Sequence, residues 1–254
     1  MAGCSCHGTL HELSVRGRKR CFLLYSPRSA SGPSPVVILH HGLAANAGWF
    51  CTAESARAAD SAGVALLCTA ALGGNWDFGA LPPGEGNACG TADLEYMLAI
   101  YGFLDGKNTR QKLDPARRFH VGFSQGALFA AVATFCALHA VVGFGQAGSS
   151  FAPMKMRVVR TVPPLRVCVW CNRNDPHCHP MTDELRAVGH EATMTWTGNG
   201  GHDFPHPWLP KCRPSLRRLS PRPGARSNSR RRRSGSRQAC VRRGSAPGGG
   251  LRMA

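Results

Sequence analysis

Short apolar runs that alternate with helix-forming segments are the feature that most constrains how this chain folds. The runs at 36–39, 64–68 and 119–123 are continuous and bounded by loop-forming residues, which is typical of strands buried on both faces. The segments 49–61 and 91–101 have the capping residues or the apolar spacing of helices. This alternation predicts a parallel sheet with helices on both faces and a ligand site at the carboxyl ends of its strands.

The rest of the chain divides into a globular part and a basic part. Further predicted elements are an edge strand at 21–25, strands at 141–144, 165–170 and 193–197, helices at 127–138 and 182–188, and a long loop at 71–90. We place one α/β domain at residues 1–210, a length that suffices for a core. Residues 211–254 hold 14 of the 31 Lys and Arg residues and no Asp or Glu, with few large apolar side chains. We expect them to form a disordered basic tail.

The sequence gives conflicting indications about the compartment. No apolar run approaches the roughly 20 residues that span a bilayer, so we expect no membrane span. The N-terminal residues carry no apolar segment of the kind found in a secretory signal, which favours the cytoplasm. Twelve cysteines are nevertheless a high count, as in proteins of oxidising compartments.

The pentapeptide Gly122-Phe123-Ser124-Gln125-Gly126 has the form G-x-S-x-G and lies between a predicted strand and an apolar helix. The turn that joins them is so tight that the flanking residues must be glycine, and the serine hydroxyl then projects at the edge of the sheet. The helix beginning at Gln125 places its positive dipole end where an oxyanion would form. This context predicts Ser124 as a nucleophile.

A serine nucleophile needs a base and an orienting acid, which follow it in the order Asp or Glu, then His. Asp175 comes just after the strand at 165–170, and His202 lies in a glycine-rich loop after the last predicted strand. We predict Asp175 as the acid and His202 as the base. His177 and His179 lie beside Asp175, and either is an alternative base if His202 is structural.

Other acidic residues nearby are explained more simply. Asp183 and Glu184 lie at the start of a predicted helix, where negative charge is favourable. Asp203 is the neighbour of His202 and lacks the reach to hold the far side of the same ring. We therefore expect none of the three to orient the base.

Ester hydrolysis also needs two backbone N–H groups that point at the developing oxyanion. Gln125, directly after the nucleophile, supplies one. The loop after the strand at 36–39 supplies the other, and Leu43 is our candidate because Gly42 lets the backbone approach closely. We assign His41 and Trp76 to substrate binding, since both lie in loops expected at this edge.

With these motifs the chain resembles an α/β-hydrolase of the extracellular polyhydroxybutyrate-depolymerase-like and feruloyl-esterase-like group, from about Leu13 to Trp208. The resemblance rests on the segments 36–43, 71–77, 90–98, 113–126, 174–175 and 200–205. It implies the α/β-hydrolase fold and esters of hydroxy acids or plant cell-wall acids as substrates, and it favours an extracellular location. Members of the group continue with a helix that packs on the sheet, whereas this sequence turns to Arg, Pro and Ser, so we expect that final helix to be missing.

The cysteines near the predicted acid superficially resemble zinc ligands. Cys168 and Cys171 are three residues apart on a predicted strand, so their side chains point to opposite faces. We therefore expect no metal, and a Cys171–Cys178 disulfide is the better explanation in an oxidising environment.

Together these features predict a serine carboxylic ester hydrolase that needs no cofactor. Its expected substrates are short-chain, hydroxyalkanoate or feruloyl- and acetyl-type esters, small or polymeric. The alternative is a catalytically impaired hydrolase fold whose arginine-rich tail, with Arg230–Arg233 at its centre, binds nucleic acid or other polyanions.

Overall fold

The computed structural model describes residues 7–28, 32–77, 89–106, 113–137, 141–149, 158, 160–178 and 182–204. The domain boundary at 210, the basic tail, the missing final helix and His179 lie outside the described residues. In chain order the elements are β1 (Thr9–Val15), β2 (Arg18–Tyr25), β3 (Ser34–His40), η1 (Ala47–Trp49), α1 (Ala53–Ala62), β4 (Ala65–Thr69), η2 (Leu72–Gly74), α2 (Ala92–Asp105), β5 (Leu113–Phe123), α3 (Gln125–Cys136), β6 (Gly143–Ala147), β7 (Arg166–Asn172), α4 (Thr182–Ala187) and β8 (Glu191–Gly198).

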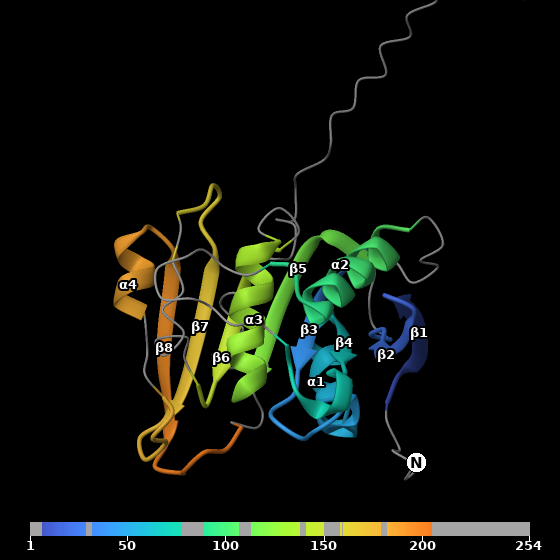
Figure 1. The fold of residues 1–254 in the computed structure, drawn as a ribbon. Helices are drawn as coiled ribbons and strands as arrows, with labels where there is room; N and C mark the ends of the chain where they lie inside the picture. The colour runs from blue at the N-terminus through green and yellow to red at the C-terminus, as the bar shows by residue number, and fades with distance from the viewer. Residues whose placement is uncertain are drawn as a thin grey trace, which may run out of the picture. The chain divides into compact units, whose positions relative to one another are not determined.

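The strands form one mostly parallel sheet (Figure 1). Their order across it is β1-β2-β4-β3-β5-β6-β7-β8, with antiparallel pairing only where β2 meets β1 and β4. The carboxyl ends of β3 and of β5 to β8 therefore meet at one edge of the sheet. The loops that follow these strands and β4, which is parallel to β3, carry every described residue that the sequence assigned to the site.

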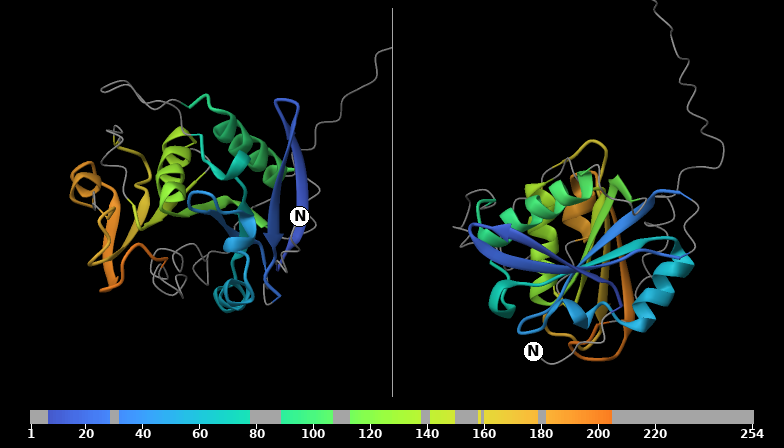
Figure 2. Two further views of the ribbon diagram at one scale, coloured as in Figure 1. Left: turned by 60° about the horizontal axis from the view of Figure 1, so that its bottom comes forward. Right: turned by 90° about the vertical axis from the view of Figure 1, so that its right-hand side faces the viewer.

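Helices cover both faces of the sheet, as the sequence predicted: α2 and α3 lie on one side and α1 on the other (Figure 2). Successive strand residues point to opposite faces, so a strand covered on both sides needs a continuous apolar run. In β3, Ile38 packs in the core under α2 and α3, and Leu39 packs in the opposite core with Phe50 and Ala59. Within the described residues no helix is long and apolar enough to cross a membrane.

The structure differs from the prediction most at the N-terminal end. The polar stretch before residue 21 contains β1, which pairs with β2 through a two-residue turn at Arg16 and Gly17, both with positive φ. β1 lies at the edge of the sheet, and most of its side chains are exposed or half-buried, so its sequence lacks the apolar run of a central strand.

The first predicted helix, 49–61, is two elements. Trp49 ends the short turn η1, whereas α1 begins at Ala53, because the Thr52 side chain accepts a hydrogen bond from the Ser55 N–H and caps the helix there. The break leaves Trp49 in the loop that follows β3.

Candidate active site

Ser124 occupies the sharp turn between β5 and α3. Its backbone has φ 52° and ψ −122°, a conformation that is strained for a residue with a side chain. A Cβ on Gly122 would lie 1.9 Å from the Gly126 carbonyl oxygen, and one on Gly126 would lie 2.2 Å from the His40 carbonyl oxygen. Both flanking glycines are therefore required, because the backbone packs against itself where their side chains would be.

A continuous hydrogen-bonded chain joins three side chains that are distant in sequence. His202 Nε2 lies 2.8 Å from Ser124 Oγ, and His202 Nδ1 lies 3.1 Å from each carboxylate oxygen of Asp175. An ionised carboxylate only accepts hydrogen bonds, so it assigns the proton to Nδ1 and leaves Nε2 to accept from the serine hydroxyl. This is the arrangement in which an imidazole can remove the proton of Ser124.

Asp175 lies in the loop between β7 and α4 and is almost fully buried there. Its side chain is 1% exposed, against 31% for His202. Besides the ring of His202, the carboxylate accepts the backbone N–H of His177 at 2.9 Å. The expected Cys171–Cys178 disulfide is present and closes this loop around the acid.

Asparagine side chains join the acid loop to the histidine loop. Asn172 Nδ2 donates to the Gly201 carbonyl at 3.0 Å, and Asn174 Nδ2 donates to the Asn199 carbonyl at 2.6 Å. These bonds set the position of His202 relative to Asp175. Sequence reasoning gave neither asparagine this role, although Asn172 ends a buried strand and Asn174 directly precedes the acid, which was a usable signal.

The alternative bases and acids are placed differently. The His177 ring lies edge-on to the His202 ring, with 4.8 Å between centroids, on the exposed side of the site. Asp183 is on the surface of α4 and pairs with Arg186. Of the histidines in the described residues, His202 is the one that contacts Ser124.

The loop after β3 passes directly beside the nucleophile. A Cβ on Gly42 would lie 3.2 Å from Phe123 Cδ1, a tight contact, and 3.5 Å from the Cβ of Ser124, so the glycine gives this close approach with the least crowding. Leu43 comes next in this loop, and Gln125 begins α3. Among the described residues we find no acceptor for the backbone N–H of Leu43 or of Gln125. Both amides are therefore available to a ligand.

The side chains of His41 and Trp76, to which the sequence assigned substrate binding, are withdrawn from the surface. Both are buried, with exposed fractions of 0% and 3%. The Trp76 ring stacks on Phe129 with 4.4 Å between centroids, beneath the loops rather than at their surface. The apolar groups that face solvent in the loop after β3 are the side chains of Leu43 and Trp49, 61% and 38% exposed.

A row of rings connects Trp49 to the candidate base. Phe123 lies between them, 5.1 Å from the Trp49 ring and 4.9 Å from the His202 ring between centroids, and Phe204 packs against Phe123 and Trp49. Sequence reasoning missed this aromatic wall. Phe123 precedes the nucleophile and Phe204 follows the base by two residues, so both lie at the strand ends where such contacts form.

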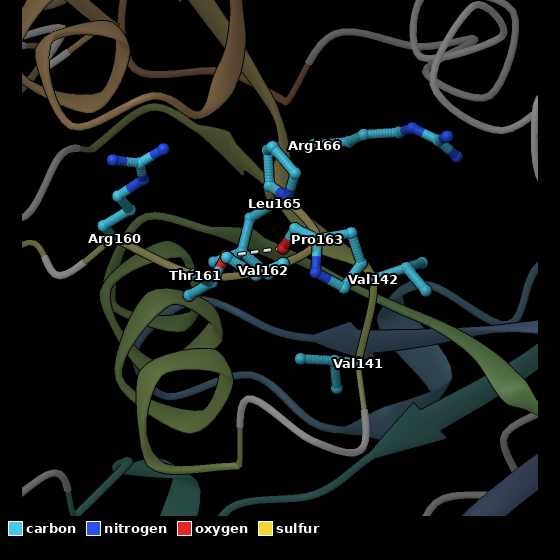
Figure 3. A pocket seen from close by; sticks show the side chains of 9 residues that line it. Val141, Val142, Arg160, Thr161, Val162, Pro163, Leu165 and Arg166 are labelled. Carbon is cyan, nitrogen blue, oxygen red and sulfur yellow. Dashed lines mark hydrogen bonds between the residues drawn. The ribbon is translucent and has the colours of Figure 1, made fainter.

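The cavity of about 380 Å³ in Figure 3 lies away from these residues. It is lined by residues 141–142 and 160–166, which precede β6 and β7, whereas Ser124 follows β5. Because the three strands are parallel, the cavity belongs to the opposite edge of the sheet. Within the described residues we also find no cluster of three or more His, Cys, Asp or Glu side chains that could hold a metal ion.

Under the site, a buried chain of hydrogen bonds crosses neighbouring strands. Thr69 Oγ1 donates to the Leu39 carbonyl and lies 2.9 Å from His40 Nδ1. His40 Nε2 lies 2.6 Å from His120 Nδ1, and His120 Nε2 lies 2.6 Å from the Tyr101 hydroxyl. Thr69 has already donated its one proton, so it accepts the proton of His40 Nδ1. His40 Nε2 then accepts from His120 Nδ1, and His120 Nε2 accepts from the Tyr101 hydroxyl.

Both histidines of this chain are neutral. Burial, with a smaller contribution from the nearby Arg118 guanidinium, lowers the pKa of His120 from its ordinary 6.5 to about 3. Burial likewise holds the pKa of His40 well below 6.5, with smaller effects from His120 and His41. These two rings therefore serve the fold as hydrogen-bonding groups rather than as bases.

Comparison with known proteins identifies the fold of the chain. No family model matches the sequence, and no curated protein does. Among solved structures, an acetyl xylan esterase from Aspergillus awamori superposes with a TM-score of 0.60 and 12% identity, over 84% of this chain and 100% of the other. A carboxylesterase from Bacillus cereus has a TM-score of 0.57 and 21% identity, over 79% and 95%. The fluorophosphonate-binding serine hydrolase F of Staphylococcus aureus has a TM-score of 0.57 and 14% identity, over 84% and 98%. The chain has the α/β-hydrolase fold.

Proposed function

We propose that the protein is a serine carboxylic ester hydrolase in which Ser124 is the nucleophile, His202 the base and Asp175 the orienting acid. The observation that carries the proposal is the single chain of contacts from the Asp175 carboxylate through the His202 ring to the Ser124 hydroxyl. The three side chains come from the loops after three different strands, β5, β7 and β8. The fold, rather than one local segment, therefore brings them together.

The proposed reaction follows from where each proton lies. Ser124 Oγ attacks the ester carbonyl while His202 Nε2 takes its proton, and Asp175 stabilises the resulting imidazolium. The Leu43 and Gln125 N–H groups stabilise the oxyanion of the tetrahedral intermediate. His202 then protonates the leaving alcohol, and water repeats the cycle on the acyl-enzyme. The cycle uses no cofactor.

The proposed substrates are short-chain, hydroxyalkanoate or feruloyl- and acetyl-type esters. The resemblance of the sequence motifs supports this class, and so does the acetyl xylan esterase among the structures with the same fold. The exposed side chains of Leu43 and Trp49 beside the candidate oxyanion donors add apolar surface that an acyl or alcohol group can contact.

The test compares hydrolysis of p-nitrophenyl acetate and butyrate by the protein and by Ser124→Ala. We expect the variant to lose all but a residual rate, a fall of at least about 10⁴-fold, as for other triad serines. The matched control is Ser61→Ala, which removes an exposed serine of α1 and should keep the full rate. A fluorophosphonate probe should label the protein and Ser61→Ala but not Ser124→Ala. Equal hydrolysis by the protein and Ser124→Ala would refute the proposal.

We also propose, as a second and separate function, that the basic segment 211–254 contacts polyanions. The observation behind it is compositional, since 14 Lys and Arg residues stand there without a single Asp or Glu. Replacing Arg230–Arg233 with Gln should weaken a gel shift of random DNA and reduce its salt dependence. Unchanged binding would refute this proposal and leave the hydrolase proposal unaffected.

A further inference from the structure

Trp76 is hydrogen-bonded to both segments that carry the candidate oxyanion donors. Its indole Nε1–H donates to the His41 carbonyl at 2.8 Å, and its backbone N–H donates to the Gln125 side-chain oxygen at 3.1 Å. His41 lies two residues before Leu43, whereas Gln125 begins α3. Trp76 therefore connects the loop after β3 to the start of α3. The distance between these two segments decides whether the Leu43 and Gln125 amides can both donate to one oxyanion.

The His41 ring extends this connection to the Leu43 amide. The Ala71 N–H donates to His41 Nε2 at 3.0 Å, so Nε2 carries no proton, and His41 Nδ1–H must donate to the Gly42 carbonyl at 2.7 Å. The Gly42 carbonyl and the Leu43 N–H belong to one planar trans peptide and point in opposite directions. Holding the carbonyl therefore aims the N–H.

The residues just before Trp76 also contact the loop after β3 and the start of α3. The Ala44 N–H donates to the Gly74 carbonyl at 2.9 Å, and Gln125 Nε2 donates to Asn75 Oδ1 at 2.9 Å. The segment 71–76 thus contacts the loop after β3 at His41 and Ala44 and the start of α3 at Gln125. We call it the brace.

A buried ion pair fixes the brace at its two ends. Arg20 and Asp93 pair with side chains 4% and 1% exposed. Arg20 also donates to the Ala70 carbonyl at 3.0 Å, and Asp93 accepts the Asp77 N–H at 2.6 Å. These bonds join the brace to β2 and α2, so it is held from the body of the domain rather than by the catalytic loops alone.

We propose that Trp76 is a positioning residue that sets the spacing and direction of the Leu43 and Gln125 amides, so that both donate to one oxyanion. The inference rests on the proposed ester hydrolysis for its catalytic consequence. It replaces the substrate-binding role that the sequence suggested for this residue, and it explains why an indole N–H is buried beneath the site.

The test removes one hydrogen bond and keeps an aromatic ring in place, with a matched control for the lost ring volume. Trp76→Phe deletes the indole N–H but keeps the backbone N–H and an aromatic ring against Phe129. The matched control is Trp170→Phe, because Trp170 is also buried and its indole N–H has no hydrogen-bond partner in the described part of the chain. Each variant is assayed with a p-nitrophenyl ester and with the corresponding thionoester, whose sulfur accepts hydrogen bonds poorly.

We expect Trp76→Phe to lower kcat for the ester about tenfold with KM changed less than twofold, because an oxyanion donor acts mainly in the transition state. The thionoester should be affected less, so the preference for the ester falls. Trp170→Phe should keep the preference. Equal ester-to-thionoester ratios in the two variants would refute the catalytic role, whatever their stabilities.

A second measurement needs no activity. In ¹⁵N-labelled protein the backbone amide signals of Leu43 and Gln125 should shift in Trp76→Phe and stay in place in Trp170→Phe. Unshifted signals in Trp76→Phe would refute the positioning role even if the protein hydrolyses esters. If hydrolysis proves independent of Ser124, the proposed function fails, and the amide signals still decide whether Trp76 positions these two groups.

Discussion

The two halves of the candidate site are built in different ways. The nucleophile half, with Ser124, Gly122 and Trp76, is held by backbone packed against backbone and by buried polar groups under the loops. The acid–base half, with Asp175 and His202, sits on two loops that are joined by asparagine side chains, and one of the loops is closed by a disulfide. Rigidity comes from the core in the first half and from local cross-links in the second.

Because the two halves are held differently, substitutions in them should affect the free energy of unfolding and the rate of hydrolysis to different extents. A change in the nucleophile half disturbs the packing of β3, β5 and α3, so it should lower the free energy of unfolding together with the rate. A change in the acid–base half leaves the packing of β3, β5 and α3 in place, so it should lower the rate with a smaller effect on unfolding. The predictions below test this separation.

The largest effect is expected from Gly122→Ala. The added Cβ would lie 1.9 Å from the Gly126 carbonyl oxygen, so β5 and α3 would have to separate. We expect a loss of more than about 3 kcal/mol in the free energy of unfolding, measured by urea denaturation, and no hydrolysis. The control is Gly102→Ala in α2, where a Cβ meets no atom within 4 Å and should add up to about 1 kcal/mol. A well-folded, active Gly122→Ala would contradict the packing argument.

Asp175→Asn should separate activity from stability most clearly. The amide can still accept the His177 N–H, but its own N–H₂ favours the wrong proton position on the His202 ring. We expect kcat to fall by about 10⁴-fold while the free energy of unfolding changes far less than in Gly122→Ala. Asp183→Asn, on the surface of α4, is the control and should leave kcat unchanged. A parallel loss of folding in Asp175→Asn would break the comparison.

The sequence predicted the part of the site that obeys local rules. The strand–glycine–serine–helix order located Ser124, and the positions of Asp175 and His202 after strands placed them at the same edge. The fold class followed from the same alternation of elements. These features depend on residues that are close in sequence, or on the repeated alternation of apolar strand runs and helical segments, which can be seen in the sequence itself.

What the sequence did not predict depends on contacts between distant segments. Trp76 looked like a pocket residue because it lies in a polar loop, and its hydrogen bond to the His41 carbonyl depends on how that loop folds back over β3. β1 was missed because an edge strand needs no apolar run. The pairing of His40 with His120 joins residues 80 apart, which no local pattern reports.

The buried histidines predict a stability that depends on pH. The pKa of His120 is about 3 in the folded protein and that of His40 is also well below 6.5, whereas both return to the ordinary value on unfolding. The unfolded chain therefore binds more protons below pH 6.5. The contribution of His120 to the free energy of unfolding is present above about pH 6.5 and is lost as the pH falls toward 3, by roughly 1 kcal/mol per pH unit. The contribution of His40 is lost in the same direction.

This prediction is checked by urea denaturation between pH 4 and 8. In the double variant His120→Asn, Tyr101→Phe, the asparagine N–H₂ still donates to His40 Nε2 and the hydroxyl that would be left unpaired is removed. We expect it to be less stable at pH 7 and to have a shallower pH dependence. An equally steep dependence would assign the acid sensitivity to other groups.

The smallest effects compare two disulfides, one in the core outside the candidate site and one in the acid–base half. Cys51–Cys68 closes 17 residues and ties the segment before α1 to β4, whereas Cys171–Cys178 closes seven residues around Asp175. Chain entropy assigns about 3 kcal/mol to the first and about 2 kcal/mol to the second. We expect Cys51→Ala with Cys68→Ala to lower the melting temperature and keep kcat within twofold. Cys171→Ala with Cys178→Ala should lower kcat several-fold for a smaller change in melting temperature, because the loop it frees carries the acid. If the first pair lowered kcat more than the second, the proposed role of the Cys171–Cys178 disulfide in holding the acid loop would be wrong.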